Sequence, residues 1–139
     1  MDILHTKNAT PSTAKQQLGP YQIESLIPEE QEASLTAYRV RIEANQVTAE
    51  SYHKIAEECY YVLEGSGIAI LDGKEHPLET GDFLRLPPGT RHKFTTGKQA
   101  LVMLDLHTPG SRPNKDVYFT DKTPEGFTKN GSPSPPNLS

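Results

Sequence analysis

Turn-forming residues interrupt the middle of this 139-residue chain at short, regular intervals. Clusters of Gly or Pro with Asp, Ser or Thr begin at positions 64, 72, 80, 87 and 96. The runs between and around them are rich in β-branched and aromatic residues, which suit a pleated sheet, and they cover residues 35–43, 58–63, 68–71, 83–86, 91–95 and 101–107. Turns at this spacing predict a β-sandwich or closed barrel, and they argue against alternating βα units and helical bundles.

Three local patterns refine this prediction. Asp72-Gly73 between two short strands predicts a two-residue hairpin, because both residues tolerate a positive φ. Residues 28–34 begin with proline and acidic residues, so we expect at most one helical turn there. In residues 35–43, every second side chain is apolar, so that Arg39 and Arg41 share the opposite, solvent-facing side. These arginines would clamp a carboxylate or phosphate only if their face lined the barrel.

Charge and composition exclude several kinds of partner. There are 14 basic and 18 acidic residues, a net charge of −4, which argues against nucleic-acid and anionic membrane surfaces. No apolar run approaches the ~20 residues that span a bilayer, and the first 20 residues lack the apolar segment of a signal peptide. The single cysteine, Cys59, cannot form an intrachain disulfide. We therefore expect a cytoplasmic protein whose partner is a small molecule.

The two ends of the chain differ in composition from its middle. Residues 1–20 are rich in Thr, Lys, Gln and Pro, and residues 121–139 in Pro, Gly, Ser and Asn. Segments of this composition do not build a core of their own. We expect an N-terminal arm over 1–20, one β domain over 21–120 and a C-terminal tail over 121–139.

Strand alternation aims two histidines and one acid into the predicted barrel. His92 has the same parity as Phe94, and His53 lies just before the next strand, which begins with Glu57 and Glu58. Alternation does not choose between the two acids, and a single histidine in a strand is usually a hydrogen-bonded core or rim residue. Together, however, two imidazoles and one carboxylate predict a divalent-metal site with open coordination positions.

The segments that carry these residues resemble the paired motifs of the cupin superfamily. The second segment matches at Gly81, Pro87, Gly89 and His92, with Thr96 where Asn is common, and the first matches at His53, Glu58 and Gly65. The spacing from Glu58 to Gly65 selects Glu58 as the acid in the ligand position. The resemblance, over about residues 35–107, implies an all-β jelly-roll barrel with short terminal arms and His53, Glu58 and His92 as metal ligands.

One position departs from this pattern. Ser51 stands where the family has the first histidine of a His-x-His pair. Either three ligands hold Fe(II), Mn(II), Ni(II) or Zn(II), with Ser51 or water completing the shell, or the site has decayed and the barrel is metal-free.

Four further residues are candidates for a role near this site. Tyr60 shares the parity of Glu58 and could bind substrate or pass a proton, and Arg85 could reach the cavity rim, so both are predicted to be catalytic. His107 ends the last strand and is expected at the rim or behind the ligands, as a possible extra ligand. Cys59 has the opposite parity to Glu58 and is expected to pack.

The resemblance implies a metal-dependent enzyme that acts on a small polar metabolite by oxygenase, isomerase or lyase chemistry. The alternative is a non-enzymatic module that binds a small molecule, and the fold alone does not choose between them. The resemblance also implies a homodimer, to which residues 21–27 could contribute a strand at the partner's edge.

Overall fold

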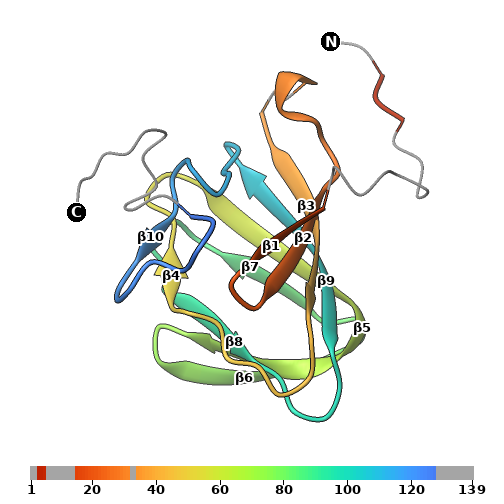
Figure 1. Ribbon diagram of the computed structural model, residues 1–139, viewed down its shortest axis with the longest axis vertical. Helices are drawn as coiled ribbons and strands as arrows, with labels where there is room; N and C mark the ends of the chain where they lie inside the picture. Colours follow the sequence, from red (N-terminus) through yellow and green to blue (C-terminus); the bar gives the residue numbers. More distant parts are fainter. Residues whose placement is uncertain (1–2, 6–14, 32–33, 128–139) are drawn as a thin grey trace.

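The computed structural model of the chain is built from antiparallel strands (Figure 1). It describes residues 3–5, 15–31 and 34–127. Its strands are β1 (Lys15–Leu18), β2 (Tyr21–Ser25), β3 (Thr36–Ile42), β4 (Ser51–Tyr52), β5 (Glu57–Leu71), β6 (Lys74–Glu79), β7 (Phe83–Leu86), β8 (His92–Thr95), β9 (Leu101–Thr108) and β10 (Tyr118–Phe119). The described residues contain no α-helix, and their helical turn, η2 (Glu29–Gln31), falls where the sequence predicts one. The all-β prediction is confirmed.

The strands form one curled sheet in the order β1-β2-β3-β9-β5-β8-β4-β10, with β6 and β7 also paired to β5. The first part of β5 pairs with β9 and β7, and its last part pairs with β6 and β8. The long strand therefore belongs to both walls of the barrel, as Figure 1 shows.

The sequence predicts two strands at 58–63 and 68–71 with a turn between them, and this prediction is wrong. A single 15-residue strand runs through the segment. The strand has an irregular register between Val62 and Glu64 and a φ of 81° at Gly65, where it passes from one wall to the other. A Cβ on Gly65 would lie 1.8 Å from the carbonyl oxygen of Ala100, so a side chain does not fit there. The glycine marks a bend in the strand instead of its end.

The predicted hairpin is confirmed. Asp72 and Gly73 have φ values of 48° and 83°, and they connect β5 to β6 with Leu71 opposite Lys74. This pair of positive φ values is typical of the two-residue turn that suits the twist of antiparallel strands.

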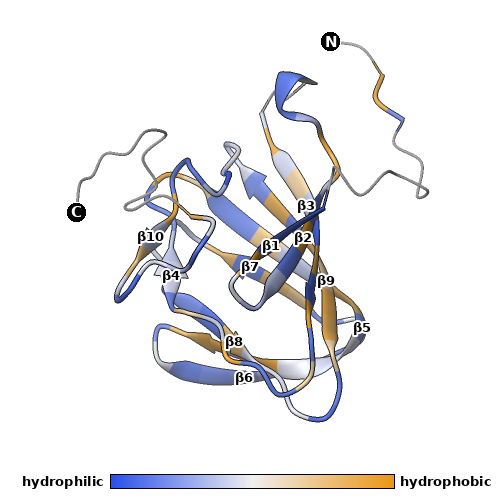
Figure 2. Ribbon diagram, viewed as in Figure 1, coloured by the Kyte–Doolittle hydropathy of each residue, from blue (hydrophilic) through white to orange (hydrophobic). Residues whose placement is uncertain are grey.

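Alternation on β3 is also confirmed. Its even-numbered residues Tyr38, Val40 and Ile42 are buried in the main core. Arg39 and Arg41 lie on the outer face, where they pair with acidic side chains. Figure 2 shows the same contrast between strands, because β9 is mostly hydrophobic whereas β1 and β6, which each have an unpaired edge, are mostly hydrophilic.

Both ends of the described chain pack on the barrel. Strand β1, within the expected N-terminal arm, pairs with β2, and its Leu18 is buried against Gly126. Near the C-terminal end, β10 pairs with β4, and the ring of Phe119 contacts that of Phe127. Most of the predicted arm and tail, residues 6–14 and 128–139, lies outside the described residues.

The strand expected at a partner's edge, β2, pairs with β1 and β3 of its own chain. The homodimer stays a prediction, and light scattering tests it. Within the described part of the chain, no helix is long and apolar enough to cross a membrane.

Candidate metal centre

Glu58 lies at the centre of the site. It is the second residue of β5, and its side chain points into the barrel with only 2% of its surface exposed. The preceding Glu57 points outward and pairs with Arg85. The motif spacing and the structure thus agree on Glu58 as the inward acid.

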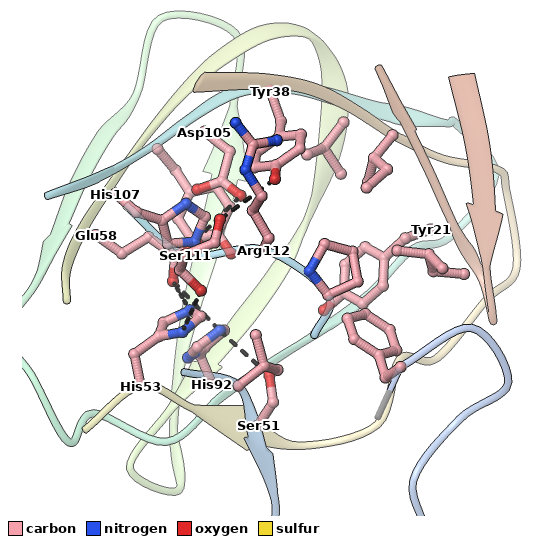
Figure 3. Close-up of a pocket in the computed structure, with 17 residues that line it drawn as sticks. Tyr21, Tyr38, Ser51, His53, Glu58, His92, Asp105, His107, Ser111 and Arg112 are labelled. Atoms are coloured by element: carbon pink, nitrogen blue, oxygen red, sulfur yellow. Dashed lines mark hydrogen bonds and ion pairs between the residues drawn. The ribbon is translucent and has the colours of Figure 1, made fainter. Parts of the chain in front are cut away.

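Three buried histidines surround the Glu58 carboxylate (Figure 3). Its Oε1 lies 3.1 Å from Nε2 of His53 and 3.3 Å from Nε2 of His92. Its Oε2 lies 2.8 Å from Nε2 of His107. The histidines follow β4, begin β8 and lie near the end of β9, so each comes from a different part of the sheet.

Backbone carbonyls orient two of these rings. Nδ1 of His53 lies 2.6 Å from the carbonyl oxygen of Asp116, and Nδ1 of His92 lies 3.1 Å from that of Thr90. A carbonyl oxygen only accepts a hydrogen bond, so each Nδ1 must carry the proton. In the neutral ring, Nε2 then presents a lone pair to the carboxylate.

A hydroxyl orients the third ring in the same way. Nδ1 of His107 lies 3.3 Å from Oγ1 of Thr36. The Thr36 hydroxyl donates its own proton to the carbonyl oxygen of Ser111, so it accepts from His107. His107 therefore also turns an Nε2 lone pair toward Glu58.

These four side chains together form a cluster of electron-pair donors that is stable only with added positive charge. Three imidazole lone pairs and a carboxylate repel one another at these distances unless protons or a cation neutralise them. Neighbouring ligands on a metal with bonds of 2.0–2.2 Å lie about 3 Å apart, close to the spacing found here. The ligand atoms of His53, Glu58 and His107 all lie within 4.8 Å of one another. This group fits a divalent cation, and His92 contacts the same carboxylate.

The pKa values of these groups reflect the same charges. Burial alone would raise the pKa of Glu58, but positive charge on His107, His53 and His92 holds it well below its ordinary value. Burial lowers the pKa of His92. Burial also acts to lower the pKa of His53, but the Glu58 charge and the Asp116 carbonyl outweigh it, so that this pKa is raised.

At the metal site, Ser51 occupies a position of the family motif, whereas His107 lies outside both motif segments. Ser51 lies beside the site, with its Oγ 3.4 Å from Nε2 of His92. The sequence predicts His107 at the rim or behind the ligands, as a possible extra ligand, and in the structure its ring lies among the donor groups, directly opposite Glu58 on the paired strand. His107 adds an imidazole to a site where Ser51 replaces one. Alternation from the buried Met103 along β9 could have indicated this inward position.

The site opens into a cavity that reaches the surface of the barrel. The polar side chains of the site line this cavity, and so do the apolar side chains of Leu18, Ile23, Pro113, Val117 and Phe127. Tyr60 lines the cavity as predicted, and burial, with the nearby charges of Asp105 and Glu58, raises the pKa of its phenol.

The other two candidates lie away from the cavity. Arg85 does not line it, because the arginine sits on the outer face with 64% of its side chain exposed. Cys59 is on the same outer face, opposite Arg85, and is only partly buried.

Part of this chain is similar in sequence to known proteins. The cupin-domain family matches residues 38–107. SchB of Streptomyces halstedii is 35% identical over 79 residues, which are 55% of this chain and 57% of that protein. Quercetin 2,3-dioxygenase of Bacillus subtilis is 36% identical over 59 residues, 42% of this chain and 18% of that enzyme. The matches thus span little more than half of SchB and less than a fifth of the dioxygenase.

Solved structures share the fold over a longer stretch. A variant of Streptomyces PAC13 with uridine has a TM-score of 0.68 at 20% identity, over 85% of this chain and 94% of that one. KdgF from a Halomonas species has a TM-score of 0.61 at 22% identity, over 68% and 84%. With the matched residues 38–107 forming the barrel around Glu58, the chain belongs to the cupin family.

Proposed function

We propose that the protein is a metal-dependent cupin that binds a divalent cation and acts on a small polar molecule in its cavity. His53, Glu58 and His107 would hold the cation, with His92 as a further ligand. The observation that carries the proposal is the orientation of the rings, because an acceptor at each Nδ1 leaves each Nε2 lone pair facing one carboxylate. Imidazole and carboxylate ligands suit Fe(II), Mn(II), Ni(II) and Zn(II).

The bound cation would supply Lewis acidity toward a substrate oxygen, or oxygen chemistry if it is iron. Tyr60 keeps its proton at neutral pH, because its pKa is raised, and its hydroxyl interacts with Glu58. A substrate oxygen would take the place of Glu58 as the acceptor of this proton. Leu18 and Phe127 line the same cavity from the two packed ends of the chain, and they make part of its wall apolar.

Three named neighbours support an enzymatic role without choosing the reaction. The relative from Bacillus subtilis is a dioxygenase, Pac13 is described as a nucleoside dehydratase, and a Silicibacter pomeroyi cupin with a TM-score of 0.61 is described as a sugar phosphate isomerase. These correspond to the oxygenase, lyase and isomerase classes that the resemblance to the cupin superfamily implies. The alternative function is small-molecule binding without turnover.

Metal analysis of protein purified without added metal, followed by calorimetric titration with the four cations, tests the proposal. We expect one cation per chain, with binding strongly weakened in His53→Ala and unchanged in His76→Ala, a histidine on strand β6 outside the cavity. A screen of small hydroxylated and carboxylated metabolites on the loaded protein then tests turnover. Negligible binding of all four cations would refute the metal site, and ligand binding without product under every cation would establish the binding module.

A further inference from the structure

Asp105 holds a buried oxygen without a partner. Among the side chains of the residues that the structure describes, its Oδ1 is the one buried polar atom with no hydrogen bond. Asp105 is on β9, two residues before His107, and it lines the cavity (Figure 3). Buried acceptors are almost always satisfied, because leaving one unmatched lowers stability. An unmatched acceptor that lowers stability and lines a cavity is a candidate for ligand recognition.

The neighbouring hydroxyls have other partners. Strand pairing sets Asp105 between Tyr38 on β3 and Tyr60 on β5. The Tyr38 hydroxyl lies 3.2 Å from the carbonyl oxygen of Ser111 and donates to it, and the Tyr60 hydroxyl interacts with Glu58. Neither tyrosine therefore satisfies Oδ1.

The Asp105 carboxyl group has its Oδ1 unmatched in the cavity wall, whereas its Oδ2 faces the metal centre, where a proton would be shared with Glu58. The other oxygen, Oδ2, lies 3.8 Å from Nε2 of His107, on the side of the metal centre. If the group is ionised, both oxygens are acceptors, and if Oδ2 carries a proton, Oδ1 is the carbonyl oxygen and still accepts. A ligand at this position must therefore bring a donor.

The surroundings restrict the donor and the body that carries it. Next to the cation and the imidazoles, a neutral hydroxyl is favoured over a charged ammonium group, which the cation would repel. The cavity is also lined by Leu18, Ile23, Val117 and Phe127, which suit an apolar ring.

We propose that Oδ1 of Asp105 accepts a hydrogen bond from a substrate hydroxyl adjacent to the oxygen that meets the metal centre. The substrate class is then a vicinal dioxygen compound with at least one free hydroxyl on an apolar, ring-sized body. The place of the second oxygen rests on the proposed function, whereas the hydroxyl at Asp105 rests on the unmatched acceptor.

Catechol and its dimethyl ether test this inference, because they share one ring and one oxygen spacing but only catechol has hydroxyl protons. Their affinities are measured by calorimetry on metal-free and zinc-loaded protein. The variants are Asp105→Leu, which replaces the acceptor with an apolar side chain, and Asp121→Leu, a control at an exposed position. Asp105→Asn keeps an acceptor of the same size, and Asp105→Ala replaces the leucine variant if that variant does not fold.

We expect Asp105→Leu to weaken catechol binding by about tenfold, the effect of one lost hydrogen bond, and to leave the ether unchanged. Asp105→Asn and Asp121→Leu should keep the preference for catechol. Thermal unfolding of Asp105→Leu should occur at the wild-type temperature or above it, since the variant removes an unmatched buried acceptor.

An unchanged ratio of catechol to ether affinity in Asp105→Leu would overturn the inference, as would a wild-type protein that does not bind catechol. A lower unfolding temperature with an unchanged ratio would assign Asp105 a structural role and would also overturn it. Absence of metal binding, with an Asp105-dependent catechol preference in the metal-free protein, would refute the proposed metal site alone. Metal binding together with a catechol preference that does not depend on Asp105 would refute this inference alone.

Discussion

Replacing His107 should weaken metal binding far more than replacing Ser51, although the family motif emphasises position 51. His107 Nε2 lies 2.8 Å from Glu58 Oε2 and belongs to the group of donors that fits a cation, whereas Ser51 Oγ contacts His92 from the side. Loss of a group that only orients a ligand costs about 10–100-fold in metal affinity. Loss of the ligand itself in His107→Ala should therefore cost about 100-fold or more, or about 2.8 kcal/mol.

The structure also predicts an intermediate case. Thr36→Val removes the hydroxyl that accepts from Nδ1 of His107 but keeps the shape of the side chain. The His107 ring stays in the site but is no longer held in one orientation, so the affinity for the metal should fall by about tenfold. Ser51→Ala should change it by less than about threefold, because no donor of the group is lost.

Calorimetric titration of Zn(II) and Mn(II) into the wild-type protein and the three variants measures this order. Circular dichroism and thermal unfolding of the metal-free proteins serve as controls for folding. Equal affinities of His107→Ala and the wild type, or a larger loss in Ser51→Ala than in His107→Ala, would refute the assignment of His107 as a ligand.

Three more predictions follow from the same contacts. Ser51→His places an imidazole beside His92, so calorimetry should show tighter metal binding, while catechol binding to the loaded protein should weaken because an open position is filled; unchanged metal affinity would contradict this. Asp116→Ala should lower the free energy of unfolding, measured in urea, by about 2–4 kcal/mol. The reason is that the carboxylate accepts hydrogen bonds from the backbone N–H groups at positions 54–56. A loss below about 0.5 kcal/mol would count against that role. Metal affinity should fall as the pH falls through the raised pKa of His53, so that the decrease begins above pH 6.5, since the cation must displace the proton; titrations at several pH values that give one constant would disagree.

Much of the site could be predicted from local patterns. Alternation placed His53, Ser51 and His92 on inward positions, and all three are buried. The choice of Glu58 over Glu57 needed the motif spacing. Adjacent residues of a strand face opposite sides, and the sequence alone does not say which of the two faces inward. The all-β class followed from the turn residues alone.

Alternation could indicate that His107 points inward, but it could not predict that His107 lies against Glu58. Its nearness to Glu58 depends on the register between β5 and β9, and pairing between distant strands is set by tertiary packing. Asp105 escaped notice for the same reason, because its missing partner is a property of three adjacent strands.

Local propensity failed at two other positions. The glycine-rich segment around Gly65 has the composition of a turn, but the pairing of β5 with both walls keeps it in a strand. Arg85 was expected to reach the cavity rim, yet the next residue, Leu86, is buried, so the arginine faces outward and pairs with Glu57.

Anomalous diffraction from crystals grown with Zn(II) would show whether Glu58 and the buried histidines hold a metal ion. Data collected on both sides of the zinc absorption edge locate the ion without reference to any assumed ligand. We expect one peak inside the barrel, about 2.0–2.2 Å from Nε2 of His53, Nε2 of His107 and an oxygen of Glu58, with His92 facing the same ion. A barrel without a peak at Glu58, or a peak whose ligands exclude both His53 and His107, would contradict it.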